Sequence, residues 1–526
     1  MDRANDMSPG ERDPEDVIDT MREKHKRKGK TFFIFIGVFL LLFGWFTRPL
    51  WHDFIFGIWK YGEVLNVLLL TAVVMGVIYY RSNNVFKAIK TGGIVFLIGW
   101  VVFMSIGNLV TQDTLASELQ FTERDDIAKI DSENPRILPQ QVSDRFAQNT
   151  LQFPRHRLGN ADITMINGSP HWSYALAPEG GLNRFVLDQK GASFVDMTNS
   201  SRNLYTIEKN VSPGQGMALW NNYLWQLRKD KYWAEHTDPF MVPHDGELYL
   251  ATPYIEYSLR FLPILHTVPE WGGVSLVNPD GSVEHLSPEE AQNSDVLSGQ
   301  RLYPFSLAYT KTNSMRFSNG IINFLFFHED QLEIASVTKH ENGQPFFVPT
   351  EEGLQYFLAV EPYGDAAGIF QVWHFDARTG EKQVYRIGED DAMLGPNRAA
   401  DYVRRASPMV DWDRLRPAEP LPVVVNDTLY WKLRVIPNDG SGISYTAFVN
   451  AKTTNVLAFE NDEDIRRFMR GEIDAEQRMV DAENTSSDDS ERMEVREGEI
   501  HLTIFEDGEL ISNHSIEGNA TIEIKR

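Results

Sequence analysis

Three apolar segments crowd the first 111 residues of this 526-residue chain. They run from Thr31 to Phe46, from Gly62 to Tyr80 and from Thr91 to Thr111. A membrane core of about 30 Å is crossed by roughly 20 helical residues, which makes each segment a candidate membrane span. No comparable segment follows Thr111. The pattern therefore predicts a small anchor of three helices, residues 31–111, that carries a large water-soluble domain.

Lysine and arginine residues around the three segments predict the orientation of the anchor. Cytoplasmic loops carry the excess of these residues. At the end of the predicted cytoplasmic tail, 1–30, six of them lie between Arg22 and Lys30, just before the first segment. Three lie between the second and third segments, whereas only Arg48 and Lys60 lie between the first and second. We therefore expect a multi-pass membrane protein with a cytoplasmic N-terminus. An odd number of spans then places everything after Thr111 on the extracytoplasmic side.

The composition restricts the partners of the outer domain. The chain has 74 acidic against 50 basic residues and a net charge of −24, which argues against nucleic-acid binding through a basic surface. It has no cysteine, which excludes thiolate metal sites and a cysteine nucleophile. The remaining expected partners are the lipid bilayer and either a protein partner or further copies of this chain in the envelope.

The outer residues predict an α+β fold that is mainly antiparallel β. Short apolar and β-branched runs alternate with turns rich in Gly, Asn, Asp and Pro, and helical spacing appears at Leu138 to Leu151 and at Asn397 to Ala406. The expected segments are a stalk (112–135), a first helix-on-sheet unit with an aromatic loop (136–270), a middle β region (271–390), a second helix-on-sheet unit (391–470), an acidic linker (471–498) and a C-terminal β-hairpin (499–526).

A strand, an Asp or Asn, a short turn and a second strand recur four times in the outer domain. The copies cover Gly191 to Leu204, Gly272 to Leu286, Val372 to Ile387 and Thr446 to Phe459. The side chains at the turns can accept backbone N–H bonds, and Gly281 and Gly380 permit positive φ. Those side chains are Asp196, Asn278, Asp376 and Asn450.

The first and last copies are each preceded by a helix and two strands. The order helix, strand, strand, strand ending in V-D-x-T or V-N-x-K-T resembles the PepSY module, although Ser200 and Thr454 stand where that family usually has glycine. The resemblance implies a helix across a small antiparallel sheet, a role in extracytoplasmic interaction or regulation, and no catalytic residues. It predicts the same fold for residues 136–204 and 397–459.

The sequence of the outer domain contains none of the common enzyme motifs. H-E-x-x-H, G-x-S-x-G and the phosphate-binding loops are absent. His328 with Asp330, and His236 with His244, could supply imidazole and carboxylate groups, but their spacing favours ordinary loops. We therefore expect no catalytic residue, no metal and no cofactor. A possible partner surface is formed by the aromatic residues Trp220, Trp225, Tyr232 and Trp233.

These observations lead to the expectation of a membrane-anchored extracytoplasmic binding or scaffold protein of a cell envelope or virion, without enzymatic activity. The alternative is a membrane-tethered extracytoplasmic hydrolase or peptidase regulator. A pocket that holds a cluster of His with Asp or Glu would favour the hydrolase.

The orientation gives the first testable prediction. Protease added to intact cells should digest the domain down to the anchor, because residues 112–526 are expected outside. Immunoblotting against tags at the two ends of the chain measures this. Full protection of residues 112–526 would contradict the predicted orientation.

Overall fold

The computed structural model describes residues 14–60, 62–150, 153–337, 343–364, 368–388, 392–473 and four strands between 492 and 523. Its sheets are antiparallel except for one parallel pair and one isolated parallel bridge, and helices accompany them, so the fold is the expected α+β class.

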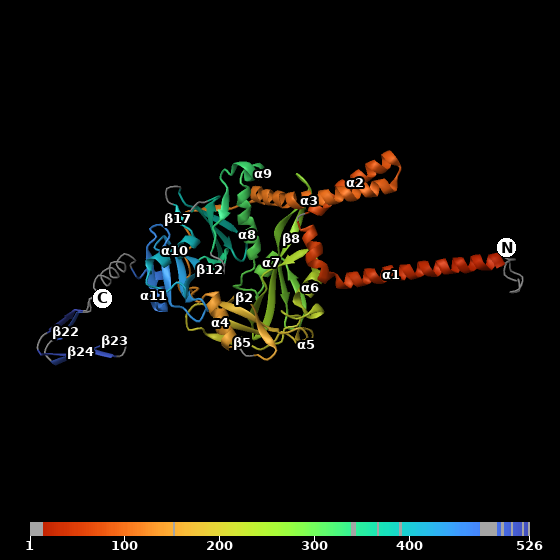
Figure 1. Cartoon of the computed structure of the whole chain (residues 1–526). Helices are drawn as coiled ribbons and strands as arrows, with labels where there is room; N and C mark the ends of the chain where they lie inside the picture. The colour runs from red at the N-terminus through yellow and green to blue at the C-terminus, as the bar shows by residue number, and fades with distance from the viewer. Residues whose placement is uncertain are drawn as a thin grey trace.

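Three helices near the N-terminus are long and apolar enough to cross a membrane. They are α1 (Pro14–Trp59), α2 (Glu63–Ser82) and α3 (Val85–Glu118). All three project from one side of the domain, and α1 changes direction where it reaches the domain (Figure 1). Pro49 lies inside α1 at this point and lacks the N–H group that would continue the helical hydrogen bonds.

The domain contains the same helix-and-sheet arrangement four times, which we name units 1 to 4. In each unit a helix precedes a four-stranded antiparallel meander, whose first strand carries a bulge in units 1 and 4 and is broken into two pieces in units 2 and 3. Unit 1 comprises α4 (Gln140–Thr150), β2 (His156–Ile166), β3 (Ser169–Pro178), β4 (Ala192–Asp196) and β5 (Leu204–Ile207). Unit 2 comprises α6 (Tyr223–Asp230), β6 (Ala234–His236), β7 (Phe240–His244), β8 (Glu247–Arg260), β9 (His266–Val277) and β10 (Val283–Leu286). Unit 3 comprises α8 (Phe305–Asn313), β11 (Leu332–Ile334), β12 (Phe346–Thr350), β13 (Gly353–Pro362), β15 (Gln371–Asp376) and β16 (Lys382–Arg386). Unit 4 comprises α10 (Pro396–Ala406), β18 (Leu415–Val425), β19 (Thr428–Pro437), β20 (Tyr445–Asn450) and β21 (Val456–Phe459).

The register of the strands is the same in all four units. In each unit we call the strand that follows the first strand, or its two pieces, the second full strand; these are β3, β8, β13 and β19. The fourth residue of this strand faces the residue just before the Asp or Asn of the turn. The facing pairs are Trp172 with Val195, Leu250 with Val277, Tyr356 with Phe375, and Trp431 with Val449. Units 1 and 4 therefore share strand order and register, as the sequence predicts, and units 2 and 3 extend the repeat.

The turn residues behave as expected in three of the four copies. Asp196, Asp376 and Asn450 each accept a hydrogen bond from the backbone N–H two residues later. In unit 2 this role passes from Asn278 to Asp280, which accepts from the N–H of Ser282.

A pair of hydrogen bonds, which we call the latch, fixes the helix to the sheet in units 1, 3 and 4. The first is donated by the aromatic residue of the second full strand to the carbonyl two residues before the helix. In the second, the backbone N–H of the residue two positions before the helix donates to the carbonyl of the residue just after the turn Asp or Asn. The first bond joins Trp172 to Leu138 (3.0 Å), Tyr356 to Tyr303 (2.6 Å) and Trp431 to Leu394 (2.6 Å). The second joins Leu138 to Met197, Tyr303 to Ala377 and Leu394 to Ala451. Unit 2 has Leu250 in the aromatic position and no side-chain donor there.

The units pack in two similar pairs. Phe194 of unit 1 lies in one core cluster with Leu227 and Leu250 of unit 2. In the same way, Phe357 of unit 3 lies in a cluster with Val403 and Trp431 of unit 4.

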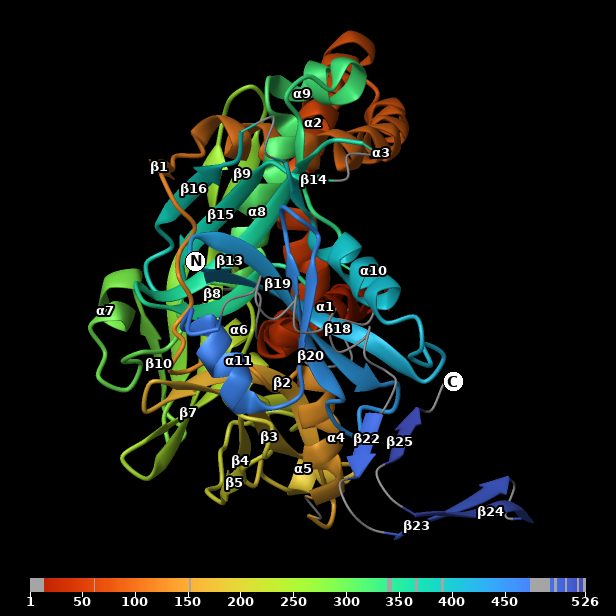
Figure 2. The same ribbon diagram turned by 90° about the vertical axis from the view of Figure 1, so that its left-hand side faces the viewer.

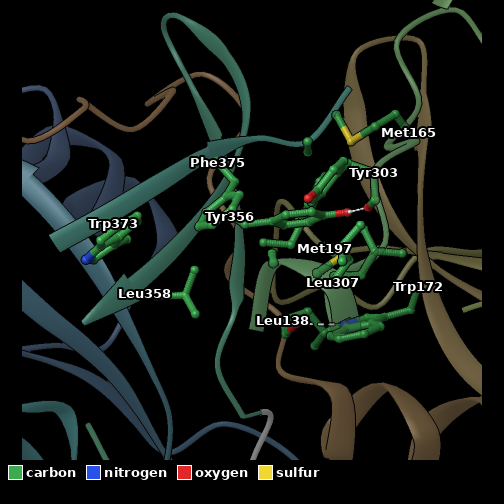
Figure 3. Close-up of a cluster of buried hydrophobic side chains, with 14 of the residues drawn as sticks. Leu138, Met165, Trp172, Met197, Tyr303, Leu307, Tyr356, Leu358, Trp373 and Phe375 are labelled. Carbon is green, nitrogen blue, oxygen red and sulfur yellow. Dashed lines mark hydrogen bonds between the residues drawn. The ribbon is translucent and has the colours of Figure 1, made fainter. Parts of the chain in front are cut away.

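A central cluster joins the two pairs of units. Trp172 of unit 1 and Tyr356 of unit 3 belong to it, together with α8 residues such as Leu307 (Figure 3). On the outer side, α11 (Asp462–Met469) covers the face of the unit 4 sheet opposite α10 (Figure 2).

A buried carboxylate ties unit 1 to unit 4. Glu419 lies in the bulge of β18 and is 3% exposed. It accepts from Arg434 (2.6 Å), from Arg136 (3.2 Å) and from the N–H of Gln140, the first residue of α4 (2.7 Å). Because buried charges persist only when they are paired, we assign this cluster a structural role.

The remaining elements are short connections. They are β1 (Thr122–Arg124), α5 (Asn183–Val186), η1 (Leu219–Asn221), α7 (Pro288–Gln292), η2 (Ser314–Phe317), α9 (Gly320–Ile322), η3 (Asn323–Phe327), β14 (Gly368–Ile369), β17 (Met393–Leu394), β22 (Arg492–Val495), β23 (Glu499–Glu506), β24 (Glu509–Glu517) and β25 (Ala520–Glu523). β23 pairs with β24 in an antiparallel hairpin within the predicted 499–526 segment. Most of the predicted linker, 471–498, lies outside the described residues.

Two predicted boundaries differ from the structure. The segment 112–135, expected to be a stalk, instead begins as the last turns of α3, and its later residues pair with β16 through β1. The boundary expected at residue 270 falls inside β9. Gly272 and Gly273 resemble a turn in sequence, but they lie at a bulge opposite Tyr254 and Ile255.

The latch predicts that Trp431→Phe lowers the free energy of unfolding by about 2 kcal/mol, because it leaves the Leu394 carbonyl without its donor and opens space in the core. Urea denaturation of the detergent-solubilised chain measures this. Trp220→Phe is the control, because that side chain is 53% exposed, and its effect should stay within about 0.5 kcal/mol. Equal stability of the Trp431 and Trp220 variants would contradict the proposed role of the latch.

Candidate anion-binding pocket

A pocket of about 180 Å³ lies where α3 enters the domain. Its walls come from the last turn of α3, from β9 of unit 2, and from α8 and β16 of unit 3. The lining residues are Leu115, Glu118, Leu119, Gln120, Val268, Pro269, Glu270, Lys311 and Lys382. A single pocket thus joins one apolar helix to two of the four units.

The α3 wall of the pocket is held on β9 by polar contacts. The hydroxyl of Thr111 donates to the carbonyl of Thr267 (3.0 Å), and the hydroxyl of Thr114 lies 2.9 Å from Nε2 of His266. His266 and Thr267 begin β9, directly before the β9 residues that line the pocket. The position of α3 therefore sets the shape of the pocket.

The two carboxylates of the pocket form ion pairs, whereas its two lysines form none with a described residue. Glu118 and Glu270 share one partner, because Arg260 lies 3.6 Å from the first and 3.1 Å from the second. Lys311 and Lys382 form no ion pair with any residue that the structure describes. The nearest ring to the Lys311 amine is Tyr303, at 5.7 Å.

Burial makes the two lysines unusual bases. It lowers the pKa of Lys311 to about 8, and the charge of Lys382 acts in the same direction. Burial also lowers the pKa of Lys382. A group with a lowered pKa regains its proton when an opposite charge approaches. The charge of Glu270 raises the pKa of Lys311 and that of Glu381 raises the pKa of Lys382, but burial outweighs both. An anion in the pocket would therefore lie beside two amines that form no ion pair with a described residue.

Three of the four aromatic residues expected to form a partner surface lie against α1. Trp225 is buried, and its ring packs edge-on against Phe46. Tyr232 packs edge-on against His52, and Trp233 lies 5.2 Å from Trp59. Trp220 and Trp233 are each 53% exposed. A surface for a separate partner at these four residues stays a prediction.

The histidines that the sequence offers as candidates for a catalytic or metal site lie apart from one another. His236 is buried beside Tyr254, and burial lowers its pKa to about 3. His244 lies next to Asp245 at the end of β7, while His328 stacks on Tyr363 and contacts Gln331. Among the residues described, no three His, Asp or Glu side chains come together as a metal site would require.

Lys311 and Lys382 were not predicted from the sequence, since they lie on different elements 71 positions apart. Isolated lysines are usually solvated surface residues, so no sequence signal separates these two from the rest. Only the approach of α8, β16 and α3 brings them together.

Comparisons with known proteins add little. No family model matches the chain, and no curated protein matches it. A solved structure described as a glycosyl hydrolase from Bacteroides ovatus matches at 11% identity and a TM-score of 0.18, covering 64% of this chain and 81% of that one.

The comparison bears on one expectation. The prediction of a non-enzymatic binding or scaffold protein is corrected to this extent: the matching structure is described as an enzyme, so the comparisons give that role no support. At this TM-score the likeness carries neither fold nor glycoside chemistry to this chain.

The pKa of Lys311 gives a prediction about stability and pH. Below pH 8 the amine is charged in both the folded and the unfolded chain, and its burial costs up to about 3 kcal/mol. That cost falls as the pH rises from about 8 towards 10.5, where only the unfolded chain keeps the proton. Lys311→Met should therefore stabilise the fold at pH 7, and the gain should shrink through this range.

Urea denaturation of the wild type and the variant at pH 7, 8, 9 and 10 tests the prediction. Lys209→Met is the matched control, because Lys209 pairs with Glu247 on the surface, and its effect should show no such trend. A stabilisation by Lys311→Met that is independent of pH would contradict the lowered pKa.

Proposed function

We propose that this chain is a membrane-anchored regulator whose extracytoplasmic domain binds a small anion beside α3 and transmits its presence to the membrane helices. The observation that carries the proposal is the continuity of α3 from Val85 to Glu118. One end of this helix is apolar enough to span a membrane, and the other end forms a wall of the pocket.

The contacts of all three helices support a domain fixed at one membrane surface. Lys60, just after α1, forms an ion pair with Glu235 at 2.8 Å. Asn66, in the first turn of α2, accepts from the N–H of Leu265, and Thr111 of α3 donates to Thr267. The distribution of Lys and Arg supports an extracytoplasmic position for this surface.

The geometry of the junction supports transmission of a signal. Gly62 joins α1 to α2 with a φ of 71°, and a Cβ atom there would lie 2.8 Å from the backbone of His266. His266 in turn contacts Thr114 of α3. A shift of β9 on ligand binding would therefore act on the link between α1 and α2 and on α3 together.

The resemblance to PepSY modules supports a regulatory output. Under this proposal the protein regulates a partner in the same envelope, such as an exported peptidase, or further copies of itself.

Calorimetry with inorganic phosphate and with acetate tests the binding step on the purified full chain. At pH 7 at least one anion should bind, and affinity should fall towards pH 9 because Lys311 loses its proton. The double variant Lys311→Met, Lys382→Met should lose binding, whereas Lys209→Met should keep it. Binding that survives in the double variant would contradict the assignment of the pocket.

A spin label tests the transmission step. The chain has no cysteine, so Ser82→Cys places a single label at the far end of α2. Saturation with the anion that binds should change the mobility of this label in nanodiscs, and the double lysine variant should show no change. Binding without any spectral change at this position would contradict the coupling.

A further inference from the structure

A second pocket, of about 320 Å³, lies between α1 and the domain. It is formed by the bend of α1, by the segment around α5 and by α6. The lining residues are Pro49, Leu50, Gly181, Arg184, Phe185, Met217, Ala218, Leu219, Asn222, Leu224, Trp225 and Arg228. It shares no residue with the pocket beside α3.

The pocket lies at the level where α1 would leave a membrane. Pro49 and Leu50 belong to the candidate span Phe35–Trp59, and Leu50 is exposed. One residue earlier, the guanidinium of Arg48 lies 3.9 Å from the ring centre of Trp45 and donates to the carbonyl of Lys229. An arginine beside a tryptophan at the end of a span is typical of the membrane–water interface.

Two chain segments near the helices expose large apolar side chains. Around α5, Leu182 is 83% and Val186 is 74% exposed. At the tip between β8 and β9, Phe261 is 70% and Leu262 is 83% exposed. This tip is fixed to α2, because Asn66 exchanges hydrogen bonds with the backbone of Leu265. Large apolar side chains gathered on one surface mark a contact with a membrane or a protein.

The charged side chains of the pocket are two arginines, which suit a phosphate group. The chain carries a net charge of −24, yet Arg184 and Arg228 line this pocket. Arg228 pairs with Asp53, whose side chain is 75% exposed. Arg184 donates to the carbonyl of Gly216 and forms no ion pair with a described residue. Arginine beside apolar side chains matches a lipid phosphate followed by acyl chains.

We propose that this face of the domain is immersed in the lipid interface, with the tips around α5 and at Phe261–Leu262 in the acyl region and the phosphate of an anionic lipid in the pocket. The exposed aromatic residues Trp220 and Trp233 then belong to the interfacial belt of the same leaflet. The inference rests on the membrane anchoring within the proposed function. It depends neither on the side of the membrane nor on the pocket beside α3, so either proposal can fail alone.

Single-cysteine fluorescence tests the immersion. The environment-sensitive dye NBD on Leu182→Cys and on Leu262→Cys should emit at shorter wavelength in nanodiscs and resist quenching by iodide. Met409→Cys is the matched control, because Met409 is 96% exposed and follows α10, on the side of the domain away from the helices (Figure 1). Emission and quenching at both tips equal to those at Met409 would overturn the immersion.

Thermal unfolding tests the lipid pocket. In detergent micelles, added phosphatidylglycerol should raise the Tm of the wild-type chain in a dose-dependent way, because a ligand of the folded state stabilises it. Arg184→Glu should abolish the rise. Arg414→Glu should keep it, because Arg414 is also an exposed arginine but lies beyond α10, and its side chain is 87% exposed.

Two other ligands test whether the pocket binds an anionic lipid in particular. Phosphatidylcholine and inorganic phosphate should each give a smaller rise than phosphatidylglycerol. Equal rises with free phosphate would overturn the assignment to a lipid. A rise that Arg184→Glu retains, or no rise with phosphatidylglycerol, would overturn the pocket as its site.

Discussion

The hydrogen bond from an aromatic side chain to the chain just before a helix is the constraint on which the domain depends. Trp172, Tyr356 and Trp431 each donate from the middle of a sheet to the carbonyl two residues before a helix. The backbone N–H of the residue that accepts this bond donates in turn to the carbonyl of the residue after the turn Asp or Asn. Helix, central strand and turn therefore have one relative position in three units, which lets their faces pack as two similar pairs.

The unit without the latch contacts all three apolar helices. In unit 2 the aromatic position is Leu250, so α6 has no such bond to its sheet. Instead, α6 and the strands of unit 2 contact the apolar helices, through Trp225 against Phe46, Arg228 to Asp53 and Thr267 to Thr111. The attachment to the helices thus stabilises the unit whose internal constraint is weakest, and it brings both described pockets close to the helix ends.

Both pockets follow from junctions between elements. Lys311 and Lys382 meet because α8 and β16 of unit 3 reach the end of α3. Arg184 and Arg228 meet beside Leu50 because α1 bends at Pro49 and lies against α6. Neither set has a periodicity or a spacing in the sequence, since each residue is supplied by a different element.

The sequence by itself determined the elements governed by local physics. Long apolar runs predict the three apolar helices, and alternating patterns with Asp or Asn turns predict the two strands that flank the turn in each of the four units. It also predicted the equivalence of units 1 and 4, because a helix stripe precedes both. The helices of units 2 and 3 were missed. The stretch expected to be an aromatic loop contains α6, and in unit 3 an interrupted first strand separates the helix from its turn at Asp376. Only the tertiary structure decided that the aromatic stretch from Trp220 to Trp233 packs beside α1, that residues 112–118 continue α3, and which lysines and arginines share a pocket. Such contacts join residues far apart in the chain, and their free energy depends on burial and partners that local sequence does not encode.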